Sequence, residues 1–94
     1  MDIARSDIVK SAAGRDRGRL FFVLGTEGEV LLLADGKSRK LERPKRKKRK
    51  HVTFACRADG RTAEKIRSGE KVTNSELRKT LAQLGGDGNP DQEG

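Results

Sequence analysis

Aromatic residues and cysteines are scarce in this sequence. It has three Phe (Phe21, Phe22 and Phe54) and no Trp or Tyr among 94 residues, so base stacking on aromatic rings can be only a minor mode of recognition. Cys56 is the only cysteine, which excludes a disulfide within the chain and leaves no C-x-x-C or Cys/His ligand set. We expect Cys56 to be a small buried apolar side chain and not a reactive thiol.

Long hydrophobic runs are missing as well. The longest, residues 20–24 and 30–34, are far too short to cross a bilayer, and the N-terminus has no apolar stretch of the kind that directs secretion. Together with the single cysteine, these absences predict a cytoplasmic protein that does not contact a membrane.

Side chains that could form a catalytic site are also lacking. His51 is the only histidine and no nucleophile pattern surrounds it, so we expect it to lie at the edge of a strand. A chain of 94 residues forms one domain at most, with a small core. We therefore expect no enzyme activity, no metal, no cofactor and no small-molecule substrate.

Positive charge, in contrast, is abundant and confined to one segment. Ten of the 14 residues from 37 to 50 are Lys or Arg and one is Glu, so this segment carries +9 in a chain whose net charge is +8. Such a run gains stability when a polyanion releases its counterions, which favours a nucleic acid as the partner. The alternatives are a solvated, disordered charge run and a nuclear localisation signal.

Short apolar runs separated by glycines predict a mostly β fold. We expect strands at residues 8–12, 20–24, 30–34 and 51–54, with a tight polar loop at 14–18 and a turn at 25–28. Asp35-Gly36 favours a two-residue type I′ hairpin turn, which predicts a further strand at 37–42 in which Arg39 pairs with Leu32. Five short strands joined by brief turns are typical of a small closed barrel.

The C-terminal part of the chain has a helical pattern. Thr73-Asn74-Ser75-Glu76 is a capping box and predicts a helix over 74–84 that ends at Gly85, and a shorter helix is expected at 62–68. Leu77, Leu81 and Leu84 share one face of the longer helix. Because the strands at 20–24 and 30–34 are apolar at every position, their outer face needs a cover, and we expect these leucines to supply it.

These patterns divide the chain into three parts. Residues 1–58 form the barrel, which includes the basic segment 37–50. A helical extension covers 59–84, and the glycine-rich, acidic residues 85–94 are expected to be a disordered tail.

From Ser6 to Leu24 the chain resembles the KOW motif of ribosomal proteins and NusG-type transcription factors. The resemblance lies in three pieces: Ile8-Val9-Lys10, Gly14-Arg15-Asp16-Arg17-Gly18-Arg19 and Phe21-Phe22-Val23. Continued through residues 30–36, the chain looks like the short bacterial KOW-domain proteins related to a large-subunit ribosomal protein of archaea and eukaryotes. Gly18 matches the expected glycine, whereas Phe21-Phe22 stand where a small residue is common.

This resemblance, which covers about residues 6–54, implies an SH3-like barrel that binds ribosomal RNA in association with the ribosome or translation. The barrel would fix the loop that carries the motif residues Gly14, Asp16 and Gly18, and Asp16 would cap this loop or pair with a neighbouring Arg. Phosphate contacts are expected from the surrounding cations: Lys10, Arg15, Arg17, Arg19, Lys37, Arg39, Lys40, Arg43, Lys45, Arg46, Lys47, Lys48, Arg49 and Lys50. Recognition would depend on charge and shape, with little readout of bases.

A second interpretation belongs to another class of protein. NusG-type KOW domains dock on the transcription machinery, and by the same resemblance the barrel and the Leu77 helix could form a protein-interaction adaptor. Ribosomal proteins are a further possible class of partner.

Overall fold

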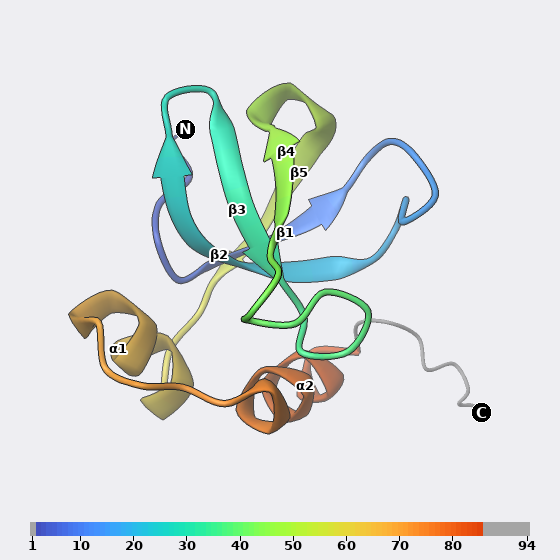
Figure 1. Cartoon of the computed structure of the whole chain (residues 1–94). Coiled ribbons are helices and arrows are strands. Elements are labelled where there is room, and N and C mark those ends of the chain that lie inside the picture. Colours follow the sequence, from blue (N-terminus) through green and yellow to red (C-terminus); the bar gives the residue numbers. More distant parts are fainter. Residues whose placement is uncertain (1, 86–94) are drawn as a thin grey trace.

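The computed structural model describes residues 2–85 and shows a small, mostly β domain with two helices (Figure 1). In chain order its elements are β1 (Asp7–Ser11), β2 (Leu20–Glu27), β3 (Val30–Ala34), β4 (Lys45–Lys48), a 3-10 turn (Arg49–His51), β5 (Val52–Arg57), α1 (Arg61–Ser68) and α2 (Asn74–Gln83). The five strands form one antiparallel open sheet in the order β4-β3-β2-β1-β5. The expectation of a mostly β fold with five strands is confirmed.

The first three strands lie where the apolar runs predict them, with one difference in β2. The expected turn at 25–28 begins later, because Gly25 continues the strand opposite Leu32 after an irregularity between Val23 and Gly25. Glu27 pairs with Val30, so the chain reverses at residues 28 and 29.

The hairpin predicted at Asp35-Gly36 is wrong, and within residues 2–85 no strand forms at 37–42. Instead, Oδ1 of Asp35 accepts hydrogen bonds from the backbone amides of Lys37 and Arg39, at 2.9 and 2.8 Å. Its Oδ2 accepts a hydrogen bond from the Ser38 hydroxyl at 2.8 Å. An Asp that bonds the backbone just after it competes with strand pairing, which explains why residues 35–44 form a loop.

β4 occupies the place beside β3 that the hairpin strand was predicted to take. Lys45 pairs with Leu33 and Lys47 with Leu31, so residues 45–48 of the basic segment are an ordered edge strand and not a disordered charge run. The last strand also differs from its prediction, since His51 lies in the 3-10 turn and β5 continues to Arg57.

Apolar side chains are buried on both faces of the sheet. One cluster contains Val9, Phe21, Val23, Leu31 and Leu33, with Val52 and Phe54 packed against it. The sheet must curve around this cluster, because it joins residues of β3 and β5 that are separated by two other strands. The alternate residues of the same strands, such as Ile8 and Phe22, point to a second cluster on the opposite face.

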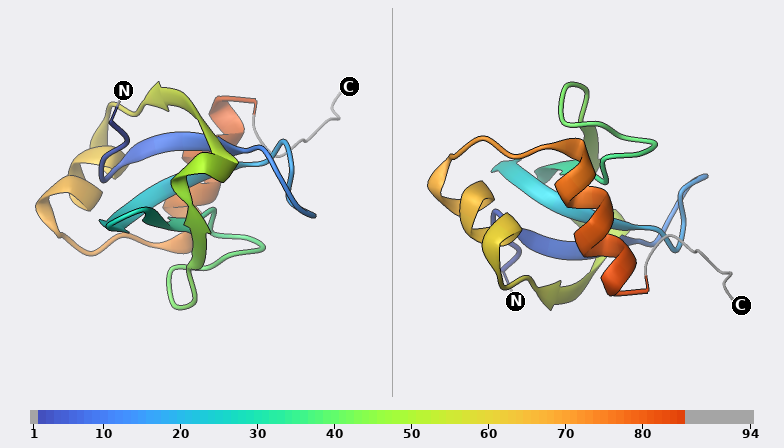
Figure 2. Two further views of the ribbon diagram at one scale, coloured as in Figure 1. Left: turned by 90° about the horizontal axis from the view of Figure 1, so that it is seen from above. Right: turned by 90° about the horizontal axis from the view of Figure 1, so that it is seen from below.

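The two helices cover that second cluster, and both lie on the same side of the sheet (Figure 2). Leu77 and Leu81 of α2 are buried there, which confirms the predicted cover for two of the three leucines. Leu84 is 48% exposed, so its assignment to this contact is wrong; it lies beyond the last residue of α2. Ala63 and Ile66 of α1 complete the cover.

The helix ends agree with the sequence patterns. The hydroxyl of Thr73 accepts from the Glu76 amide and the Glu76 carboxylate accepts from the Thr73 amide, so the predicted capping box is confirmed. Gly85 has a φ of 76°, as expected for a helix stop. The predicted disordered tail otherwise falls on residues 86–94, outside the described part of the chain.

Candidate nucleic-acid interface

The motif loop, defined here as residues 12–19, joins β1 to β2 and projects from the sheet (Figure 1). Gly14 and Gly18 have φ values of 87° and 89°, in the left-handed region that favours glycine, which confirms the tight loop. The Gly18 amide donates to the Ser11 carbonyl at 2.8 Å, so the loop is closed at its base. Arg15 and Arg17 are exposed on it.

Asp16 fixes this loop to the basic edge strand. Its Oδ1 lies 2.9 Å from Nζ of Lys47, and its Oδ2 lies 2.9 Å from Nζ of Lys45. The Ser11 hydroxyl donates a third hydrogen bond to Oδ1 at 2.7 Å. Asp16 thus pairs with two lysines of a distant strand, whereas the expectation of a neighbouring Arg is wrong.

Lys47 is the one residue of the basic run that lies in the interior. Its side chain is 8% exposed, and the three N–H groups of its ammonium are matched by three acceptors: Oγ of Ser11 at 2.8 Å, the Ala13 carbonyl at 2.6 Å and Asp16. A buried ammonium with all donors satisfied holds the structure together and has no N–H left for a phosphate. Lys47 therefore does not belong among the RNA-contacting residues, where the sequence had placed it.

The same contacts determine the charge state of Asp16. Burial raises the pKa of this carboxyl, but the hydrogen bonds from Lys47, Ser11 and Lys45 outweigh burial and hold the pKa well below its ordinary value. Asp16 is therefore ionised at neutral pH, and the loop remains bound to β4.

A shallow basic pocket of about 300 Å³ forms where the motif loop meets the loop at 35–44 and the start of β4. It is lined by Arg15, Asp16, Arg19, Ser38, Arg39 and Lys45. Nη1 of Arg19 donates to Oγ of Ser38 at 2.8 Å, which links the two loops directly. The structure thus brings together four of the predicted cations from three separate segments, with Asp16 as the single acid among them.

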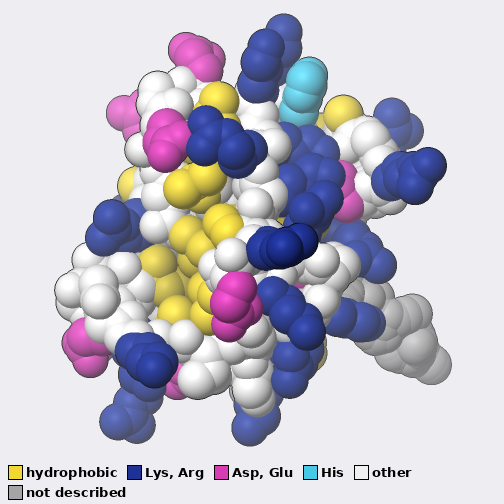
Figure 3. Space-filling view, viewed as in Figure 1, with side chains coloured by type: hydrophobic (Ala, Val, Ile, Leu, Met, Phe, Trp, Pro, Cys, Tyr) yellow, Lys and Arg dark blue, Asp and Glu magenta, His cyan; other side chains and the backbone are white. Residues whose placement is uncertain are grey.

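The remaining predicted cations lie around this pocket or apart from it. A neighbouring middle hollow of about 270 Å³ is lined by Lys37, Ser38, Arg39, Lys40, Glu42 and Arg43. In Figure 3, Lys and Arg side chains form a band over β4 and the loop before it. Lys10 lies apart from these cations, in another hollow that is lined mainly by small and apolar residues such as Leu20 and Cys56.

The outer cations of the 45–50 region have different surroundings. Arg46 is 60% exposed and pairs with Glu27 at 2.6 Å, while Lys48 and Lys50 are exposed. Arg49 turns toward the N-terminal segment, where its Nη2 donates to the Ile3 carbonyl at 3.1 Å. Arg46, Lys48 and Lys50 are therefore more exposed than Arg49, which is half-buried.

Two residues of this surface were missed by the sequence analysis. Arg78 of α2 donates from Nη1 to the Gly36 carbonyl at 2.7 Å and so joins the cations of the 35–44 loop. Asn74 accepts a hydrogen bond from the Leu41 amide at 2.8 Å and donates one to the Glu42 carboxylate at 3.1 Å. The bond that it donates lowers the pKa of Glu42. Both lie more than 30 residues along the chain from their partners, so no local pattern could have revealed them.

Two further properties concern residues 2–85 as a whole. No helix within this range is long and apolar enough to span a membrane. His, Cys, Asp and Glu side chains in the same range do not gather in groups of three or more that could hold a metal ion. Cys56 is half-buried against the cluster under the helices, less enclosed than predicted.

No model of a known protein family matches the chain, and no curated protein matches it either.

Proposed function

We propose that this chain is a non-enzymatic RNA-binding protein of the KOW type, with an SH3-like barrel, which acts in the cytoplasm in association with the ribosome or translation. The observation that carries the proposal is the basic pocket, in which Arg15 and Arg19 of the motif loop meet Arg39 and Lys45. Cations that converge from three segments onto one concave surface fit a polyanion with closely spaced phosphates.

The arrangement of the sheet supports the KOW assignment. The glycine-containing loop lies between the first two strands, and the core cluster shared by β1, β2, β3 and β5 requires a curved, barrel-like sheet. In this arrangement the loop is rigid, because Asp16, Lys45 and Lys47 tie it to β4.

The proposed mechanism is recognition of the RNA backbone. Guanidinium groups bind phosphate oxygens through two parallel N–H donors, and Arg15, Arg19 and Arg39 can act together in this way. Since these groups contact phosphates, sequence readout should be slight. If about five phosphates of a single strand are contacted, log affinity should fall with log salt concentration with a slope of about −3.5.

A paired substitution tests this mechanism. Arg15→Gln with Arg39→Gln removes two charges of the basic pocket, and the control variant, Arg61→Gln with Lys71→Gln, removes two exposed charges outside it. Binding of a fluorescent single-stranded RNA is measured by anisotropy at several salt concentrations. We expect the pocket variant to bind more weakly and the magnitude of its slope to fall by about 1.4, from about −3.5 to about −2.1, and the control to change little. Equal losses in both variants would contradict the proposal.

A second experiment identifies the RNA and separates this function from that of a protein adaptor. Crosslinking in cells followed by sequencing of the attached RNA should recover ribosomal RNA, and the pocket variant should lose it. If the pocket variant keeps its cellular partner and no RNA is crosslinked, the adaptor that docks on the transcription machinery is the better explanation.

A further inference from the structure

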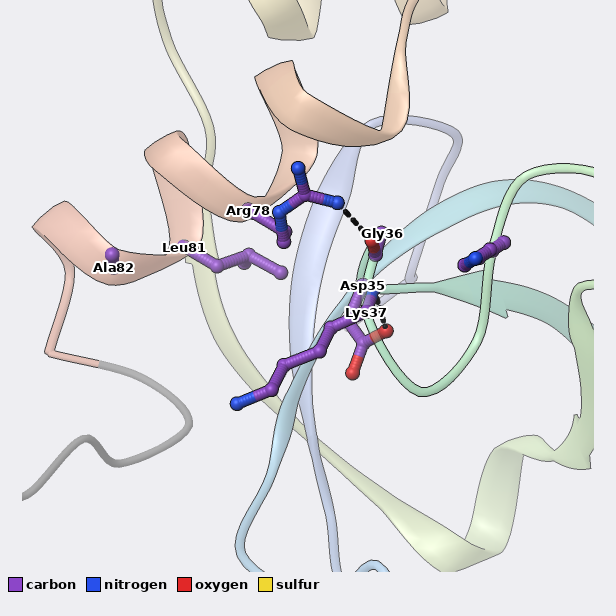
Figure 4. A pocket seen from close by; sticks show the side chains of 7 residues that line it. Asp35, Gly36, Lys37, Arg78, Leu81 and Ala82 are labelled. Carbon is purple, nitrogen blue, oxygen red and sulfur yellow. Dashed lines mark hydrogen bonds between the residues drawn. The ribbon is translucent and has the colours of Figure 1, made fainter.

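A larger hollow lies between α2 and the loop at 35–44 (Figure 4). It has a volume of about 520 Å³, which is within the range of about 300 to 1,000 Å³ typical of small-ligand sites. Lys37, Lys40 and Arg78 supply positive charge, and the exposed Ala82 of α2 supplies apolar surface above Leu81, which is 3% exposed. We refer to it as the helix hollow.

Arg78 is held in place at this hollow. Its Nη1 donates to the Gly36 carbonyl at 2.7 Å, and Figure 4 shows its guanidinium between α2 and Gly36. A guanidinium has five N–H groups, so this bond to Gly36 uses one of them and leaves donors that can bind an anion. Because the group is already oriented, it loses little side-chain entropy when it binds.

The wall of the helix hollow also contains one acid, whose charge offsets only part of this positive charge. The acid is Asp35, and its two carboxylate oxygens are used by the amides of Lys37 and Arg39 and by the Ser38 hydroxyl. Three cations and one acid leave the hollow with an excess of positive charge.

The helix hollow continues the surface described above. It shares Lys37 and Lys40 with the middle hollow, which in turn shares Ser38 and Arg39 with the basic pocket. The three depressions therefore follow one another along the loop at 35–44, from the motif loop to α2. A flexible polyanion can bend to contact all three depressions, whereas a rigid duplex has a fixed shape and cannot adapt to them.

We propose that the helix hollow binds one nucleotide of single-stranded RNA, with its phosphate beside Lys37, Lys40 and Arg78 and its base on the apolar surface at Ala82. This inference rests on the proposed function and assigns a role to α2. The bases of a duplex are paired and stacked and cannot reach an apolar surface of this kind, so the site selects an unpaired nucleotide.

The test compares two adjacent cations of α2. Arg78→Gln removes the charge at the hollow, and Lys79→Gln removes an exposed charge that does not line it. Each variant is titrated with a fluorescent single-stranded RNA and with an RNA duplex of the same length. We expect Arg78→Gln to weaken single-strand binding about ten-fold, as for the loss of a charged hydrogen bond, and to leave duplex binding within two-fold. Lys79→Gln should leave both within two-fold.

The outcomes separate this inference from the function on which it rests. If the wild type binds neither RNA, the proposed function fails. If the wild type binds but Arg78→Gln equals Lys79→Gln, or weakens both RNAs equally, only the helix hollow is refuted.

A second pair of variants tests the same site if Arg78→Gln destabilises the protein, which a lower urea midpoint of unfolding would show. Ala82→Glu places a carboxylate in the hollow, and Gln83→Glu places one on the next exposed residue outside it. Weaker single-strand binding for Ala82→Glu alone supports the site, and equal binding by the two variants overturns it.

Discussion

In the loop half of the basic segment, residues 37–44, the backbone is held in place and the charged side chains point outward. Asp35 binds two amides of this half, and Asn74 binds a third. In the strand half, residues 45–50, the side chains themselves are held, because Lys45 and Lys47 turn inward to Asp16. Two adjacent basic stretches thus make different contributions, because the charged side chains of the loop half are exposed and part of the strand half is used for stability.

The largest effect should come from the acid on which the strand half depends. Asp16→Ala leaves two lysines without their partner, one of them buried, and we expect the free energy of unfolding to fall by about 3 to 5 kcal/mol. The control is Glu27→Gln, which breaks the exposed pair with Arg46 and should cost less than about 1 kcal/mol. Urea denaturation measures the free energy of unfolding of both variants. Equal losses would show that the contacts of Asp16 with Lys45 and Lys47 do not stabilise the strand half.

Acid should weaken the same contact. The pKa of Asp16 is lower in the folded protein than in the unfolded chain, where it is near the ordinary value of 3.8. Its contribution to stability is therefore fully present above that value and is lost as the pH falls below it toward the folded pKa. We expect the wild type to lose more stability than Asp16→Asn between pH 5 and pH 2, as measured by urea denaturation. Parallel curves would contradict the lowered pKa.

The loop half should respond most strongly to a change at Gly36, the residue directly before it. This residue has a φ of 78°, and an added Cβ would collide with the Asn74 carbonyl and press on Leu77. Gly36→Ala should therefore cost about 2 to 3 kcal/mol, from the left-handed backbone and the forced contact together. The control is Gly28→Ala. Gly28 has a φ of 62° and an added Cβ would meet no atom within 4 Å, so this variant measures the backbone cost alone. If thermal or urea unfolding shows the same loss for both, α2 does not press on this loop.

A smaller effect is expected at Asn74, which anchors the loop half to α2. Asn74→Ala removes the acceptor of the Leu41 amide and the donor to Glu42, and should cost about 1 kcal/mol. Hydrogen exchange at the Leu41 amide should become faster, because this amide loses its partner. Ser75→Ala, at the exposed next position, should leave that exchange rate unchanged.

Local patterns predicted the elements that depend on local contacts. The apolar runs gave β1, β2 and β3, and the capping box gave the start of α2. Asp35-Gly36 misled because the same Asp can either begin a hairpin or bind the amides after it, and the second choice also frees Gly36 to meet α2. That contact joins residues far apart in the chain.

The candidate site could be predicted only in part. Charge density identified the segment 37–50, and the motif identified the loop with Arg15 and Arg19, but the inward direction of Lys47 has no local signal. In an all-basic strand no apolar alternation marks the inner face, and the acid that marks it is 31 residues away. Arg78 was missed for a similar reason, since it follows the buried Leu77 as an ordinary exposed helix residue.

The contact of Asp16 with Lys47 also selects one alignment from several that would otherwise be nearly equivalent. Residues 45–50 read Lys-Arg-Lys-Lys-Arg-Lys, so sliding this segment along β3 replaces one cation with another and leaves the composition of each face almost the same. A single carboxylate reduces this ambiguity, because its two oxygens accept the ammonium groups of two particular side chains, Lys45 and Lys47. A repetitive sequence can thus adopt one structure when the information that specifies it lies elsewhere in the chain.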